Sequence, residues 1–305
     1  MGPVIGLLAL CVLLSVTSPH FLRVDNLLNI FRQSSVNACL ALGQLMVILT
    51  AGIDLSVGSL LALCGVLMAL MLKAGVPVLP ALIATILLGL FMGAVNGLLL
   101  TRLRLPHPFI STLGTMNVAR GLAFIVTGGF SVSGLPEAAR FLGAGMLGPI
   151  PVPVATVILI YILFHVFLTR TTVGRDIYAV GGNKEAARLS GIPVNRRLTL
   201  VYTLSGGMAA LGAIILTGRM NSGFPLAGQG AELDSIAAVI IGGASFFGGV
   251  GNVWGTLVGA LIMGVLRNGL NLLDISTFWQ TVVIGLVIIG AVWMDVLRRK
   301  GNNSA

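Results

Sequence analysis

Long apolar segments follow one another along the whole chain and restrict the fold more than any single motif does. Each is about as long as the hydrocarbon core of a bilayer is thick, the length that a membrane-spanning helix needs. Because the segments are continuous rather than alternating, they exclude a membrane β-barrel. The sequence therefore predicts an all-α polytopic membrane protein, folded as one domain over residues 1–305. The ten predicted transmembrane segments are 3–17, 35–51, 57–72, 79–100, 109–127, 152–169, 199–217, 234–248, 252–266 and 278–296.

Composition agrees with a membrane location, since only 9% of the residues are charged and 56% are hydrophobic. A soluble domain of this length needs more charge on its surface. The net charge of +9 could suggest nucleic acid, but most Lys and Arg lie between apolar segments without interleaved aromatic residues. Cys11, Cys39 and Cys64 all fall inside apolar segments and lack the spacing of disulfide or metal sites. We expect no nucleic-acid partner and no metal in this chain.

The basic residues also predict the orientation in the membrane. The first segment lacks the basic start and clean cleavage site of a signal peptide, so we interpret it as a first span that starts abruptly. Ten crossings place both termini on one side, and a cytoplasmic location of both puts more Lys and Arg inside than outside. The inner set is Arg102, Arg104, Arg170, Arg175, Lys184, Arg188, Arg196, Arg197, Arg298, Arg299 and Lys300, and the outer set is Arg23, Arg32, Lys73, Arg140, Arg219 and Arg267.

Two short patterns occur twice in the chain. "GIDLSVGSL" (52–60) and "MGAVNGLLL" (92–100) are similar to "AELDSIAAV" (231–239) and "MGVLRNGLNLL" (263–273). The two copies start about five spans apart, and an odd offset means opposite orientations in the membrane. This is the arrangement of two inverted five-helix repeats, which many transporters contain. Short glycine and leucine matches also arise by chance in any apolar chain, so both explanations remain open.

Glycine spacing indicates close helix packing and short or broken helices. Gly89, Gly93 and Gly97 recur every four residues, which places a small-residue face on one helix. The run "GGASFFGGVGN" (242–252) has glycines enough for a phosphate cradle, but its apolar surroundings favour a bent or broken helix. Some of the segments within 35–72 and 234–266 are therefore expected to span the membrane only in part.

The most polar stretch of the chain is an insert at 170–197 between two apolar segments. Within it, "NKEAARLSG" predicts one short helix with Asn183 as its N-cap and Gly191 as its stop. Glu185 and Arg188 are three residues apart and can pair along the helix. The insert is long for an idle loop, and ordered long loops are often functional.

The composition of this short helix suggests a docking element rather than an ordered loop alone. Ala186 lies in the first turn, Ala187 is small enough to allow another surface to approach closely, and Leu189 adds an apolar side chain beside the charged pair. From the residues alone, an ordered cytoplasmic loop and a docking helix are both open.

Three stretches of the chain carry a family resemblance. "EAARLSG" (185–191) resembles the Glu-Ala-Ala-x-x-x-Gly coupling loop of ABC importer permeases. "SVNACLALGQLMVILTAGIDLSVGSLLAL" (35–63) and "AGQGAELDSIAAVIIGGASFFGGVGNVWGTLVGALIMGVLRNGLNLL" (227–273) are similar to signatures of the ribose-type monosaccharide permeases. The resemblance covers nearly the whole chain.

The resemblance implies the membrane subunit of an ATP-driven sugar importer in the bacterial inner membrane. Two permease copies, identical or related, would form the path between them, and a periplasmic sugar-binding protein would deliver the sugar. A separate ATPase subunit, with ATP and Mg²⁺, would dock on the coupling helix. The coupling residues implied by the resemblance are Gly182, Asn183, Glu185, Ala186, Ala187, Arg188, Leu189 and Gly191.

The chain contains no G-x-x-x-x-G-K-[ST] phosphate loop, so we expect ATP hydrolysis in the partner and no enzymatic activity or cofactor here. The alternatives are a permease of the same family for another small polar solute such as a furanose signal, a secondary transporter driven by an ion gradient, and a non-transporting scaffold. A gradient-driven transporter needs carboxylates near the bilayer midplane. The nine acidic residues lie near predicted membrane faces or in loops, which disfavours it.

Polar residues inside apolar segments are the candidates for a translocation path or gate, because each needs a partner or a water-filled cavity. Asp54 can cap the following helix through the N–H groups of residues 56 and 57, and Asp234 repeats that pattern. Arg120 is expected to pair with a carbonyl or carboxylate. The asparagines can bind sugar hydroxyls or form interhelical hydrogen bonds. The full candidate set is Asp54, Ser56, Asn96, Asn117, Arg120, Asp234, Asn268 and Asn271.

Overall fold

The computed structural model describes residues 2–103 and 105–303, and describes side chains as far as Leu297. Arg104, which is predicted to be cytoplasmic, therefore lies outside the described residues, as do the side chains of Arg298, Arg299 and Lys300.

Helices account for most of the described chain, and each of the ten predicted apolar segments falls on one of them. The ten are α1 (Gly2–Thr17), α2 (Val24–Leu49), α3 (Val57–Lys73), α4 (Val78–Thr101), α5 (Pro108–Thr127), α7 (Val152–Arg170), α10 (Val194–Met220), α11 (Ala231–Ile241), α12 (Val253–Leu272) and α13 (Thr277–Asn303). Among the described residues, six helices are long and apolar enough to cross a membrane, namely α4, α5, α7, α10, α12 and α13, and α1 and α3 are shorter apolar helices. The chain is therefore an all-α polytopic membrane protein.

The remaining elements lie between these helices. They are α6 (Glu137–Ala144), α8 (Thr172–Gly182), α9 (Lys184–Leu189) and two short antiparallel pairs. Strand β1 (Val132–Ser133) pairs with β4 (Ser222–Gly223), and β2 (Met146–Leu147) pairs with β3 (Ile150–Pro151).

The predicted helix at 234–248 is wrong in its second half, since α11 ends at Ile241. Three glycines in the following loop, Gly243, Gly248 and Gly249, have positive φ angles of 95°, 85° and 73°, which break the helix. At 11 residues, α11 extends about 17 Å at 1.5 Å per residue. A bilayer core is about 30 Å thick, so α11 is a short helix of the kind expected in this glycine-rich region.

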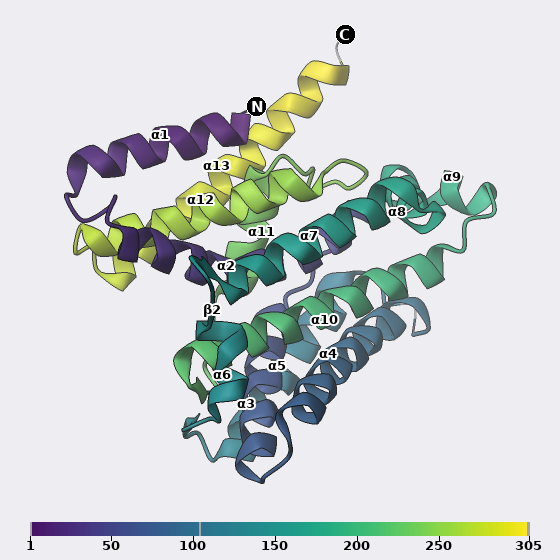
Figure 1. Cartoon of the computed structure of the whole chain (residues 1–305). Helices are drawn as coiled ribbons and strands as arrows, with labels where there is room; N and C mark the ends of the chain where they lie inside the picture. Colours follow the sequence, from purple (N-terminus) through teal and green to yellow (C-terminus); the bar gives the residue numbers. More distant parts are fainter. Residues whose placement is uncertain (1, 104, 304–305) are drawn as a thin grey trace.

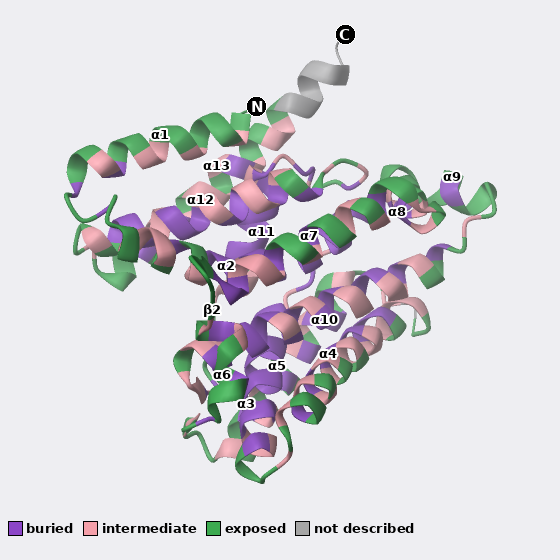
Figure 2. Ribbon diagram, in the orientation of Figure 1, coloured by how far each residue is buried: buried purple, intermediate pink, exposed green. Residues whose placement is uncertain are grey.

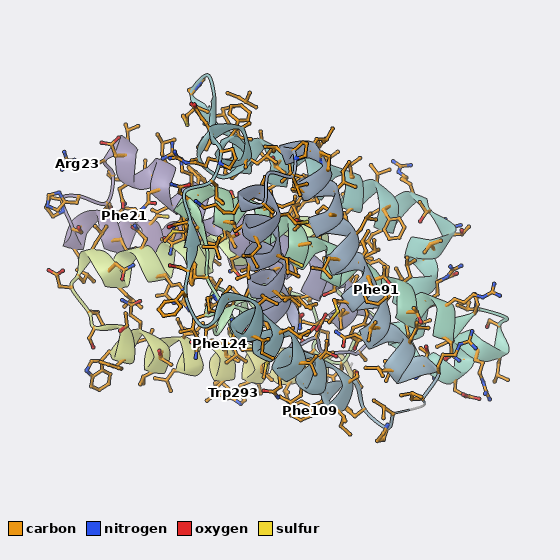
Figure 3. The ribbon with its side chains drawn as sticks, turned by 90° about the horizontal axis from the view of Figure 1, so that it is seen from below. Phe21, Arg23, Phe91, Phe109, Phe124 and Trp293 are labelled. Atoms are coloured by element: carbon orange, nitrogen blue, oxygen red, sulfur yellow. The ribbon has the colours of Figure 1, made fainter. Side chains whose placement is uncertain are left out.

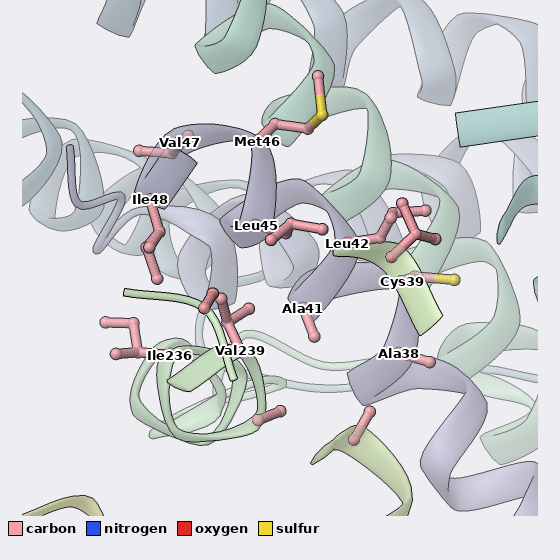
Figure 4. Packing of buried hydrophobic residues seen from close by; sticks show 14 of the residues in the cluster. Ala38, Cys39, Ala41, Leu42, Leu45, Met46, Val47, Ile48, Ile236 and Val239 are labelled. Carbon is pink, nitrogen blue, oxygen red and sulfur yellow. The ribbon is translucent and has the colours of Figure 1, made fainter. Parts of the chain in front are cut away.

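Helix α2 lies at the centre of the bundle. It packs against α7, α10, α11 and α12, and every residue from Ala38 to Leu49 is buried. In Figure 1, α3–α6 and α10 gather on one side of α2, and α1 and α11–α13 gather on the other. Buried residues concentrate where these groups meet in Figure 2. Figure 4 shows Leu45 and Ile48 of α2 beside Ile236 and Val239 of α11, in the largest apolar cluster.

Glycines bring α4 and α10 into backbone contact, as their spacing predicts. A Cβ atom added at Gly206 would collide with the Gly89 carbonyl and approach the Gly93 nitrogen to 2.8 Å. A Cβ atom at Gly93 would in turn collide with the Tyr202 carbonyl. Because lipid is as apolar as a leucine side chain, such close packing is a main source of helix association in membranes.

Large apolar side chains cover the outside of the bundle. Phe91 of α4, Phe109 and Phe124 of α5 and Trp293 of α13 are exposed. All four are labelled in Figure 3, where Phe109 and Trp293 lie near the edge of the molecule. In an aqueous protein such a surface would drive aggregation, whereas in a bilayer it faces lipid or another membrane subunit.

Candidate functional site

The polar insert forms two helices at one end of the bundle, beyond the ends of α7 and α10 (Figure 1). The predicted short helix is α9, and the preceding helix α8 was not expected. The Asn183 side-chain oxygen accepts from the N–H groups of Glu185, at 3.0 Å, and Ala186, at 2.9 Å, so Asn183 caps α9 as predicted. Gly191, with a φ of 82°, ends it.

The exposed face of α9 carries the charged pair and an apolar side chain. Arg188 and Glu185 form an ion pair of 2.8 Å, as their spacing predicts. Leu189 is 80% exposed, so its apolar side chain lies on the outer surface of α9 beside the charged pair. Ala187 was expected to let another surface approach, but it is buried against Val180 and other residues of this chain. The small side chain of Ala187 therefore lets α9 pack closely against other parts of the same chain.

Three contacts fix α8 to the membrane helices. The Arg197 guanidinium at the start of α10 donates twice to Asp176 of α8, with both N···O distances 2.8 Å. The Tyr178 hydroxyl donates to the Gly251 carbonyl over 2.9 Å. Burial raises the pKa of Tyr178 above the ordinary tyrosine value. A Cβ atom at Gly181 would collide with the Leu49 carbonyl at the end of α2. The insert is therefore in direct contact with α2, with α10 and with the loop after α11.

The first polar cluster centres on Asp54, between α2 and α3. Its side chain is 0% exposed. The Ser56 N–H donates to one carboxylate oxygen over 3.0 Å as expected, and the second donor to that oxygen is the Ser56 hydroxyl, at 2.6 Å, rather than the N–H of residue 57. Ser205 of α10 donates to the other oxygen over 2.8 Å. Asn96 of α4 donates to the Ser56 hydroxyl over 2.8 Å, so the cluster joins α3, α4 and α10.

Two further side chains hold the backbone of the same turn. The Tyr202 hydroxyl donates to the Ile53 carbonyl over 3.2 Å. The Gln44 amide, oriented with its nitrogen toward the Asp54 carbonyl, donates to that carbonyl and accepts from the Asp54 N–H, both at 3.2 Å. Gln44, Tyr202 and Ser205 were not among the residues predicted from the sequence. Their only sequence signal is a polar group inside an apolar segment.

We predict that Asp54→Ala lowers stability more than Asp54→Asn does. Alanine leaves the buried hydroxyls of Ser56 and Ser205 without their acceptor, and each orphaned group costs about 1–3 kcal/mol. Asparagine keeps one oxygen for Ser56, and the Ser205 hydroxyl can rotate to accept from the new amide. The measurement is the unfolding temperature of the detergent-solubilised permease. Equal losses in the two variants would show that the negative charge, rather than the hydrogen bonds, stabilises the turn.

The second polar cluster contains Asp234 of α11 and Arg267 of α12. Two guanidinium nitrogens of Arg267 contact one Asp234 oxygen, at 2.9 and 2.6 Å. The predicted capping role of Asp234 is wrong, because α11 begins at Ala231 after an N-cap at Gly230 and the carboxylate turns toward α12. Arg267, the basic partner of Asp234, was predicted only as one of the basic residues on the outer side of the membrane.

The other candidates lie apart from both clusters. Arg120 donates to the carbonyls of Pro225, at 2.6 Å, and Ala227, at 2.8 Å, which confirms carbonyl pairing. Asn117 is exposed and bonds within its own helix. Asn268 exchanges hydrogen bonds with Asn26 of α2, and Asn271 accepts from Gln280 of α13. Within one chain, the eight candidates therefore do not form one continuous path.

Comparison of the sequence with known protein families shows which family the chain belongs to. The family described as "Branched-chain amino acid transport system / permease component" matches residues 26–292. The chain belongs to this permease family.

Relatives within the family give a finer comparison. The permease is 46% identical over 297 residues to the ribose import permease protein of Bacillus subtilis (strain 168), covering 97% of this chain and 92% of that protein. It is 43% identical over 288 residues to the D-allose transport system permease protein of Escherichia coli (strain K12), covering 94% and 88%. The xylose transport system permease protein of the same strain is 36% identical over 341 aligned positions, covering 92% and 86%. The ribose-type resemblance is thereby confirmed. No solved structure gives a significant match.

Proposed function

We propose that the permease is the membrane subunit of an ATP-driven importer for a monosaccharide, a pentose or a hexose, in a bacterial inner membrane. The observation that carries this proposal is the similarity to ribose, allose and xylose permeases over nearly the whole length of the chain. The polar insert, with its capped and exposed helix α9, supplies the docking element that such a subunit needs.

We propose ten membrane segments with both termini in the cytoplasm. The excess of Lys and Arg at the end that carries α8 and α9 supports this orientation. The short helix α11 counts as one segment, because much of the loop that follows it, including Gly242, Ala244, Ser245 and Gly248, is buried within the protein.

Two inverted repeats are supported by the positions of the two polar clusters. Asp54 precedes the short helix α3 and connects through Ser56 to Asn96, near the end of α4. Asp234 lies in the first turn of the short helix α11 and pairs with Arg267, near the end of α12. In the proposed topology the first cluster lies in the cytoplasmic half and the second in the outer half. Each repeat then places an acidic residue and a polar partner at equivalent positions, with inverted orientation.

Coupling to ATP is proposed to pass through α9. The ATPase subunit, which binds ATP and Mg²⁺, would contact Gly182, Asn183 and the exposed side chains of Glu185, Ala186, Arg188 and Leu189. Ala187 and Gly191 would maintain the shape of this helix. Closure of the ATPases would displace α8 and α9, and the contacts of α8 with α2 and α10 would transmit that displacement. Two permease copies would then change the side to which the path opens, as alternating access requires. A periplasmic sugar-binding protein would supply the solute.

Co-purification followed by transport tests this proposal. The tagged permease is extracted gently from its native membrane, and its partners are identified by mass spectrometry. The complex is then placed in liposomes, with ATP supplied on the side of the membrane to which α9 projects. We expect an ATPase with a phosphate loop, and uptake of D-ribose, D-allose or D-xylose that requires ATP and the binding protein. Uptake that follows an ion gradient without ATP would support a secondary transporter instead. ATP-dependent uptake of a different small polar solute would support an importer of the same permease family that has another substrate.

A further inference from the structure

A groove of about 800 Å³ lies between the end of α4 and the start of α10. The two helices are antiparallel, because Gly89 contacts Gly206 whereas Gly97 contacts Thr199. The last residues of α4 therefore lie at the same depth as the first turns of α10, at the end of the bundle that carries α9 (Figure 1). At about 30 Å³ per water molecule, the groove has room for a ligand much larger than water.

Two arginines line this groove. Arg102 is the C-cap of α4, Arg196 lies in the first turn of α10, and both are exposed. Neither guanidinium takes part in the three ion pairs that the described side chains form. The Thr101 and Thr199 hydroxyls join the two helices here over 3.1 Å, and the Asn195 amide lines the same groove. The groove therefore offers an anion two positive charges and further hydrogen-bond donors.

Each arginine lies one helical turn from a leucine that lines the same groove. Leu98 precedes Arg102 by four residues and Leu200 follows Arg196 by four residues, so each pair shares a helix face. Because the helices are antiparallel, both leucines lie deeper in the membrane than the arginines, by about 6 Å at 1.5 Å per residue. Leu98 is 44% exposed, and Phe91 continues the exposed apolar face of α4. The groove is thus cationic near the membrane surface and apolar below it.

The chain's own carboxylates do not complement these arginines. At this end of the bundle, Asp176 and Glu185 form ion pairs with other arginines, and Asp295 accepts two hydrogen bonds from the loop after α11. Among the described side chains, a second copy of the permease therefore has no free carboxylate at this end to place in the groove. A free anion such as phosphate would match the charge but would make no use of the two leucines.

We propose that this groove binds the headgroup of an anionic phospholipid, such as phosphatidylglycerol, in the leaflet at the α9 end of the permease. Arg102 and Arg196 donate to the phosphate oxygens, and opposite charge strengthens these hydrogen bonds. Leu98 and Leu200 pack against the upper part of the acyl chains. Basic pockets between membrane helices are known to bind anionic headgroups in this way. The bound lipid bridges α4 and α10 and so stabilises the contact that their glycines form.

This inference goes beyond the proposed function and requires neither transport nor ATP. Only the name of the leaflet, the cytoplasmic one, comes from the proposed topology. The two arginines favour phosphatidylglycerol over phosphatidylethanolamine, because the ammonium group of the second lipid offsets the charge of its phosphate and finds no carboxylate in the groove.

Native mass spectrometry of the purified, delipidated complex measures lipid binding directly. Phosphatidylglycerol and phosphatidylethanolamine are added separately, and inorganic phosphate is added as a competitor. We expect the wild-type complex to bind phosphatidylglycerol at least about tenfold more tightly than phosphatidylethanolamine. Arg102→Gln/Arg196→Gln should abolish this preference. The matched control Arg170→Gln/Arg175→Gln removes two exposed arginines from the same end that do not line the groove, and should keep it.

The unfolding temperature gives a second readout. Phosphatidylglycerol should raise it for the wild-type complex, as a ligand of the folded state does, and should leave that of Arg102→Gln/Arg196→Gln unchanged. Equal binding of both lipids by the wild-type complex, or equal loss of the preference in the control variant, would overturn the inference. Displacement of the lipid by an equal concentration of inorganic phosphate would assign the groove to a free anion instead.

A protein occupant of the groove would give a different result. In that case Arg102→Gln/Arg196→Gln would release the ATPase or a second permease copy from the purified complex, and the wild-type complex would show no preference for phosphatidylglycerol. Because no readout depends on sugar uptake, failure of the proposed function and failure of the lipid site are distinguishable.

Discussion

Gly206→Leu is expected to prevent the permease from accumulating as a folded protein. Even a Cβ atom at this position collides with the Gly89 carbonyl, and the neighbouring obstacle is the backbone nitrogen of Gly93 rather than a flexible side chain. Overpacking usually costs about 1–3 kcal/mol when side chains can move aside. Here α4 and α10 must separate along their whole contact, so the loss should exceed that range. The measurement is the yield of monodisperse protein and its unfolding temperature in detergent.

Gly6→Leu is the matched control, since a Cβ atom at Gly6 of α1 meets nothing within 4 Å. Both variants add the same side chain to a glycine in an apolar helix, and both gain helix propensity. The control should accumulate at the wild-type level. Similar losses in both variants would mean that added bulk impairs membrane insertion in general, and that the α4–α10 contact does not determine stability.

Helix positions could be predicted from the sequence because the apolar segments are long and continuous. Boundaries were less accurate where polar residues continue a helix beyond its apolar part. Helix α2 begins at Val24, well before the predicted start at residue 35, because its first turns carry Asp25, Asn26 and Arg32. The glycines after Ile241 end α11 through positive φ angles, a choice of conformation that hydropathy does not encode.

Local signals predicted helix α9 well and the polar clusters poorly. The cap at Asn183, the pair Glu185–Arg188 and the stop at Gly191 depend on residues a few positions apart, so the sequence contains them directly. The pair Asp234–Arg267 and the groove between α4 and α10 depend on how separate helices pack. Asp54 and Asp234 have similar sequence surroundings and different partners, because different helices lie next to them.

Glu185→Lys is expected to reduce ATP-driven sugar uptake by at least about tenfold, a coupling loss of about 1.4 kcal/mol. The exposed pair Glu185–Arg188 contributes only about 0.2–0.5 kcal/mol to its own helix. The stability of α9 alone therefore cannot account for a tenfold loss of uptake. A loss of that size would come from the surface that α9 is proposed to present to the ATPase, where Leu189 lies beside Glu185.

The double variant Glu185→Arg/Arg188→Glu separates these two causes. It restores an ion pair within α9 but reverses the charges offered to the partner. If Glu185 acts in docking, the double variant remains as defective as Glu185→Lys, and both lose the ATPase during purification while the permease itself stays folded. Recovery of uptake in the double variant would show that Glu185 only stabilises α9. In that case the only docking contact proposed for α9 would be the apolar side chain of Leu189. Leu189→Asp would then be the variant expected to uncouple ATP hydrolysis from transport.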